Sequence, residues 1–147
     1  MSMALLLHLV GVIVWVGGMI FANFALRPSV GMLPPPQRLA LLAEVFGRFL
    51  PLVGISVVLI LGSGVAMIGT AGGMKAVGTA IHAMTGLGVL MTLVFVYVWA
   101  VPYRELRAAA AENAWDRAGR AMARIRMLVA FNLILGLVTL PFAVAGR

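Results

Sequence analysis

The chain has two histidines, His8 and His82, and each lies inside a long apolar stretch. His8 is the one ionisable residue of "LLLHLVGVIVWVGGM", and His82 is the one ionisable residue of "VGTAIHAMTGLGV". Neutral imidazoles bind copper, zinc and haem iron. An ionisable side chain is costly inside a bilayer and by default indicates function, although a histidine that only hydrogen-bonds across a bundle is the simpler alternative. Two such residues favour a bound metal or haem.

The composition places these histidines in a membrane. Of the 147 residues 63% are hydrophobic and 10% are charged, and the mean hydropathy is +1.12. Crossing a hydrocarbon core of ~30 Å takes about 20 apolar residues. Four runs meet this length, at about 3–26, 50–71, 77–101 and 127–145. Because the runs are continuous rather than alternating, we predict an all-α fold, a single transmembrane four-helix bundle over residues 1–147.

The basic residues are strongly segregated along the chain. Nine of the eleven lie between the first two runs or between the last two: Arg27, Arg38, Arg48, Arg104, Arg107, Arg117, Arg120, Arg124 and Arg126. The positive-inside rule therefore predicts that both of these loops are cytoplasmic and that both termini lie outside. The net charge of +7 is explained without a nucleic-acid partner. No basic residue precedes the first run, so we expect a retained helix rather than a cleaved signal peptide.

This topology places the two histidines at one depth. The first and third helices run in the same direction, and each histidine lies about five residues, or roughly 7 Å, from the outer end of its helix. Gly11 and Trp15 share the helical face of His8, and Gly86 shares the face of His82. Small neighbours leave room for a flat group between the helices. We therefore predict a cofactor site formed by His8, Trp15, Gly11, His82 and Gly86, with both imidazoles as metal ligands.

The other residues narrow the choice of metal. The chain has no cysteine, and its four runs contain no carboxylate to compensate a divalent ion, which disfavours zinc. Haem b is the leading prediction, because haem brings four nitrogens of its own and fits an apolar slot between helices. Copper(I) is the alternative, because it accepts imidazole together with thioether. Five methionines lie toward the outer side: Met1, Met3, Met67, Met74 and Met84.

Prolines and an asparagine predict where the helices end. Pro28 and the run 34–36 are expected to end the first helix, with a new helix starting at the last of these prolines. Pro51 is expected to mark a bend between an interfacial segment and the second span. Asn113 is expected to cap a helix that begins at Ala114.

Four segments together resemble the copper resistance protein D (CopD) family of bacterial inner-membrane proteins: "LHLVGVIVWVGGMIFANFALRP", "RFLPLVGISVVLILGSGVAMI", "IHAMTGLGVLMTLVF" and "RIRMLVAFNLILGLVTL". The most specific parts are His8 followed by Trp15, Gly17 and Gly18, and His82 at the start of the third span. The resemblance implies a multi-pass protein of the bacterial inner membrane with a role in copper handling or uptake, whose outer side, where both termini are predicted to lie, is then the periplasm.

The chain also resembles the four-helix bacterial protoporphyrinogen oxidases, which bind haem b. Those proteins have a histidine in the first span and another in the third, matching His8 and His82 here. They also have a lysine two residues after the third-span histidine, and this position is Met84 in the present chain.

These observations lead to one principal function and two alternatives. The principal hypothesis is a CopD-like protein that holds haem b or copper between His8 and His82 near the periplasmic face, with a role in copper handling or electron transfer. The alternatives are a haem-dependent oxidoreductase and a structural or assembly protein without a cofactor, so enzymatic activity is left open. Expected partners are the lipid bilayer, the haem or copper ion, a periplasmic or membrane redox partner, and a second copy of the chain.

Overall fold

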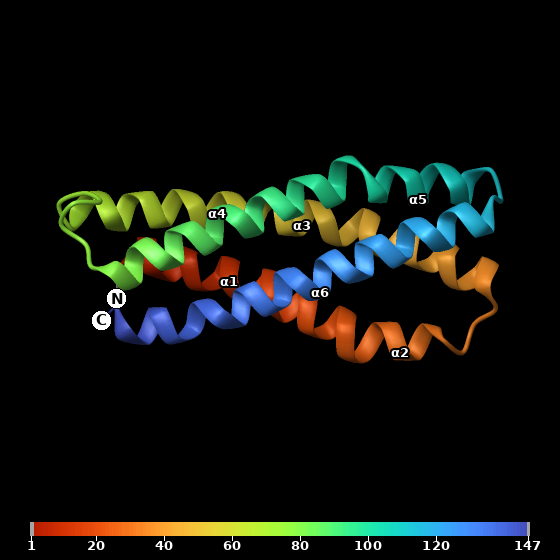
Figure 1. Ribbon diagram of the computed structural model, residues 1–147, viewed down its shortest axis with the longest axis horizontal. Helices are drawn as coiled ribbons and strands as arrows, with labels where there is room; N and C mark the ends of the chain where they lie inside the picture. Colours follow the sequence, from red (N-terminus) through yellow and green to blue (C-terminus); the bar gives the residue numbers. More distant parts are fainter. Residues whose placement is uncertain (1, 147) are drawn as a thin grey trace.

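The computed structural model describes residues 2–146, and this part of the chain folds as a bundle of long helices (Figure 1). The elements are α1 (Met3–Phe21), the π-helical η1 (Ala22–Leu26), α2 (Arg27–Val30), α3 (Pro35–Thr70), α4 (Thr79–Ala100), α5 (Pro102–Ala111) and α6 (Trp115–Ala145). They form four continuous rods that are long and apolar enough to cross a membrane, Met3–Val30, Pro35–Thr70, Thr79–Ala111 and Trp115–Ala145. The predicted all-α membrane bundle is confirmed.

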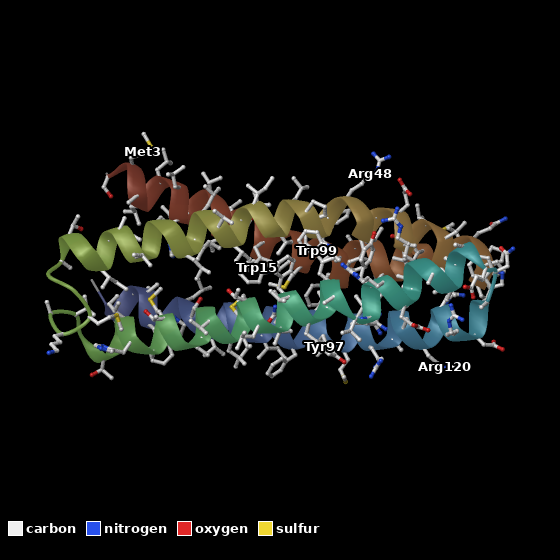
Figure 2. The ribbon with its side chains drawn as sticks, turned by 90° about the horizontal axis from the view of Figure 1, so that it is seen from above. Met3, Trp15, Arg48, Tyr97, Trp99 and Arg120 are labelled. Carbon is white, nitrogen blue, oxygen red and sulfur yellow. The ribbon has the colours of Figure 1, made fainter. Side chains whose placement is uncertain are left out.

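The two ends of the bundle differ in chemical character. Both termini and the turn between α3 and α4 lie at one end, which we call the terminal end (Figure 1). The α2–α3 and α5–α6 connections lie at the other, which we call the arginine end. Figure 2 shows Arg48 and Arg120 toward the arginine end and Met3 toward the terminal end. Which end faces the cytoplasm remains the prediction of the positive-inside rule.

Pro28 does not end the first rod, contrary to expectation. The chain stays helical to Val30, and Pro28 occupies the first turn of α2. Just before it, η1 shifts the hydrogen-bond register, so that the Arg27 N–H reaches the carbonyl of Ala22, five residues back. A single π-helical turn of this kind accommodates a local irregularity without breaking the helix. The first rod is therefore longer than predicted.

Two other predicted boundaries are also corrected. Pro51 lies inside α3, which runs unbroken for 36 residues from Pro35. Proline is tolerated within transmembrane helices because neighbouring groups satisfy the backbone atoms that it leaves free. Asn113 does not cap α6, since it has a φ of 55° in the connecting turn and Ala114 is the N-cap. Asparagine is one of the few residues that enter this left-handed region readily.

The core contains a cluster of aromatic side chains near the middle of the bundle. Trp15 meets Phe95 edge to face with ring centroids 6.1 Å apart, and Phe95 lies 5.4 Å from Trp99. Figure 2 shows both tryptophans near the middle of the bundle. Met19 of α1 is buried in the same core. The Asn132 side-chain amide donates to the carbonyl of Met91 at 3.0 Å and so joins α6 to α4.

Candidate functional site

A cavity of about 400 Å³ lies between all four spans at the terminal end. We call it the histidine cavity. Its walls include His8, Trp15, Ile60, Gly64, Met67, Met84, Thr85, Met91, Gly136 and Thr139. A cavity with mostly apolar walls and a few polar groups is the usual form of a small-ligand site.

Hydrogen bonds hold one edge of the His8 ring. Its Nδ1 lies 3.0 Å from the Ser63 hydroxyl oxygen and 3.2 Å from the Ile60 carbonyl oxygen, both on α3. The Ser63 hydroxyl in turn donates to the carbonyl of Leu59. A carbonyl oxygen can only accept a hydrogen bond, so Nδ1 carries the proton. Nε2 of the neutral ring therefore keeps its lone pair.

This arrangement resembles the support that metal-binding histidines receive. Such residues almost always donate their second ring N–H to a carbonyl, carboxylate or water, which sets the tautomer and the ring orientation. Ile60 and Ser63 supply that support for His8. The residues present thus fit a metal bound at Nε2.

Three methionines share the cavity with His8. Met67 comes from α3, and Met84 and Met91 come from α4. Met91 is buried, and the other two are half-buried. Within residues 2–146 there is no group of three or more His, Cys, Asp or Glu side chains that could hold a metal ion. The donors of the cavity are therefore one imidazole and several thioethers, a soft and uncharged set.

The structure does not bring His82 to this cavity. The His82 side chain is exposed, its Nδ1 lies 2.9 Å from the carbonyl oxygen of Gly78 on the same helix end, and it is absent from the cavity walls. Successive residues of a helix are rotated by about 100°. Met84, Gly88 and Met91 therefore define the inward face of α4, and His82 lies on a different face. This differs from the predicted pair of facing imidazoles.

Of the other three predicted site residues, one lines the cavity and two do not. Trp15 lines the cavity with His8. Gly11 is buried but serves α1–α3 packing, because a Cβ there would lie 2.7 Å from Ile60 Cγ1 and 3.0 Å from the Ser56 carbonyl oxygen. Gly86 is exposed, with no atom within 4 Å of a Cβ built on it. The structure joins His8 and Trp15 and leaves His82 and Gly86 outside.

Met91 is the cavity residue that the sequence reasoning missed. Its signal was the spacing of Met84, Gly88 and Met91, which places these residues on one helical face. The cost of an ionisable side chain in a bilayer instead predicts that the His82 face of the third span points inward. His82 is exposed and lies on a different face of α4 from these residues.

The fold and cavity define a class of protein, a four-helix multi-pass membrane protein with a soft-donor cavity between its spans. Residues 43–145 match the family model described as copper resistance protein D, CopD. Because this match covers more than half of the chain, the protein belongs to the CopD family. No curated protein and no solved structure matches the chain. The family match begins within α3, so the assignment of His8 depends on the geometry described above.

Proposed function

We propose that this copper-resistance-family protein handles copper at the terminal end of its bundle, binding Cu(I) in the histidine cavity. His8 Nε2 and the thioethers of Met67 and Met84 are the proposed ligands. The observation that carries the proposal is the His8 ring. Its Nδ1 edge is held by Ser63 and Ile60, and the residue lines a cavity whose walls include three methionines.

The charge of the cavity favours Cu(I) over a divalent ion. Imidazole and thioether are neutral, and no carboxylate is among the cavity walls. A divalent ion in so apolar a site would lack charge compensation. Cu(I) carries one charge and accepts both soft ligands. In this proposal copper is the cargo of the protein, exchanged with the compartment at the terminal end.

Haem b has weaker support than copper from the arrangement of the residues. The haem hypothesis used His8 and His82 as axial ligands on two facing helices. His82 is exposed and lies outside the histidine cavity. A haem between the spans would have His8 as its one histidine ligand. For this reason the electron-transfer role and its redox partner are secondary to copper handling in our proposal.

The two histidines offer a matched pair of variants to test the proposal. Purified protein in detergent is titrated with Cu(I) in competition with a chromogenic Cu(I) chelator. His8→Ala is expected to weaken binding by about 100-fold, because a ligand is removed. His82→Ala is expected to bind like the wild type, because its side chain lies outside the cavity.

Three outcomes would overturn the copper proposal. An equal loss of Cu(I) affinity in the two variants would indicate that His8 and His82 bind the metal together. A Soret band in the wild-type protein, lost in both variants, would indicate haem b. A wild-type protein that binds no Cu(I) would leave His8 as a residue that only braces α1 against α3.

A further inference from the structure

A second cavity, of about 580 Å³, lies at the arginine end between the η1–α2 segment, α3 and α6. We call it the arginine cavity, because Arg27, Arg38, Arg120 and Arg126 contribute to its walls. It is separate from the histidine cavity. On the first rod the histidine cavity extends to Val16 and the arginine cavity begins at Ala22, with buried Met19 between them.

The arginine cavity has a large excess of positive charge. Asp116 is the one acidic residue in its walls, so four guanidinium groups and one carboxylate give a formal charge of 4 − 1 = +3. The other three acidic residues of the chain pair elsewhere, Glu44 with Arg48, and Glu105 and Glu112 with Arg117. Within residues 2–146 no ion pair involves any of the four cavity arginines.

One of these arginines also lacks a hydrogen-bond acceptor. Arg38 Nε is buried without a partner in the structure. Leaving a buried charged donor unsatisfied is costly, so such a group indicates a missing acceptor. Guanidinium groups match the oxygen atoms of phosphate and carboxylate particularly well. The charge excess and the unsatisfied donor both point to an anionic ligand.

The rest of the cavity is apolar, which narrows the class of ligand. Leu26, Leu39, Phe46, Met122 and Val129 contribute to its walls. Leu26 belongs to the first membrane-crossing rod and Val129 to the last, so the cavity reaches from the helix ends into the spanning region. A ligand that fills it needs an anionic group at one end and an apolar body at the other. Basic pockets between transmembrane helices bind lipid headgroups in this way.

We propose that the arginine cavity binds an anionic phospholipid. Its headgroup phosphate lies among Arg38, Arg126 and Arg27, and part of its acyl chains covers the apolar walls. The phosphate oxygens supply the acceptor that Arg38 Nε lacks. This site does not depend on the proposed copper function, because the two cavities share no wall residue.

Thermal unfolding of the delipidated protein in a neutral detergent tests the proposal. Phosphatidylglycerol, phosphatidylcholine or inorganic phosphate is titrated into wild type, the double variant Arg38→Gln with Arg126→Gln, and the control Arg48→Gln. Arg48 is a suitable control because its side chain is 82% exposed and lies outside the cavity. Phosphatidylglycerol is expected to raise the Tm of wild type and control. Its apparent affinity for the double variant is expected to be about 30-fold weaker.

Phosphatidylcholine and inorganic phosphate test whether the cavity selects an anionic lipid rather than any lipid or a free anion. The phosphate of phosphatidylcholine is balanced by its choline cation, so equal stabilisation by this lipid would show that the cavity does not select a net anionic headgroup. Equal stabilisation by inorganic phosphate would show a site for a free anion. Either result overturns the lipid proposal, as does an unchanged response in the double variant. If the double variant does not fold, Arg126→Gln alone is used, because that side chain is exposed. It is expected to bind phosphatidylglycerol about fivefold more weakly than wild type.

Discussion

At the scale of single residues, the hydrogen bonds of His8 decide what its ring can do. Ile60 and Ser63 both contact Nδ1, so the lone pair is on Nε2. The Nδ1 of His82 also meets a carbonyl oxygen, that of Gly78, but the His82 side chain is exposed at the start of α4 and is not among the cavity walls. Two histidines at a similar distance from the end of their helices therefore differ in role because of the face on which each one lies.

The support of His8 by Ser63 leads to a prediction at this scale. Ser63→Ala removes one of the two groups at Nδ1 and leaves the Ile60 carbonyl, so the tautomer persists while the ring is held less firmly. We expect Cu(I) affinity to fall by about tenfold, less than for His8→Ala. Chelator competition measures this change.

Ser56→Ala is the control for that prediction. Ser56 is also buried on α3, but its hydroxyl donates to the Leu52 carbonyl, whereas that of Ser63 contacts His8. We expect Ser56→Ala to bind Cu(I) like the wild type. If Ser63→Ala also binds like the wild type, Ser63 has no part in holding the ring.

At the scale of helices, the contact between α1 and α3 positions His8 beside its partners. Gly11 lies at the closest approach, where a side chain would meet Ile60 and the backbone oxygen of Ser56. Small residues allow such approach in membrane bundles, where packing rather than the hydrophobic effect holds helices together. Ile60 is also the residue whose carbonyl contacts His8. Packing at Gly11 and the geometry of the cavity are thus linked.

This packing predicts a large effect of a side chain at position 11. Gly11→Val must push the two helices apart, because a backbone oxygen cannot move aside. We expect it to lower the free energy of unfolding by about 1–3 kcal/mol. Unfolding in detergent micelles measures the loss. The control is Gly17→Val on the same helix, where no atom lies within 4 Å of the added Cβ. Equal stability of the two variants would contradict the close contact.

At the scale of the whole molecule, the main feature is that the two cavities lie at opposite ends of the bundle and differ in charge. The soft-donor cavity lies at the terminal end and the arginine-lined cavity at the other. If the positive-inside rule holds for this chain, the histidine cavity opens toward the outer compartment and the arginine cavity toward the cytoplasmic leaflet. Copper would then enter from outside, and anionic lipid would bind from inside.

The orientation is directly testable because the chain has no cysteine. Lys75→Cys and Arg48→Cys introduce single thiols at the two ends, both at exposed positions. With a membrane-impermeant maleimide, we expect spheroplasts to label Lys75→Cys and to label Arg48→Cys only after lysis. The reverse labelling pattern would show that the protein has the opposite orientation in the membrane. It would also place the histidine cavity on the cytoplasmic side.

The sequence alone was sufficient to determine the class of fold, because long apolar runs can satisfy their backbone in a bilayer only as helices. It also indicated that His8 and the outer methionines were candidates for copper binding. The sequence did not determine the exact boundaries, since Pro28 and Pro51 are tolerated within helices by local backbone adjustment.

Only the tertiary structure decided which faces meet. Met84 and Met91 face the interior and His82 does not, although an ionisable residue was expected to point inward. The rotation of each span about its axis depends on contacts such as that of Gly11 with α3, which join residues far apart in the sequence. In a uniformly apolar helix, hydrophobic periodicity carries little information about rotation, so packing between helices had to supply it.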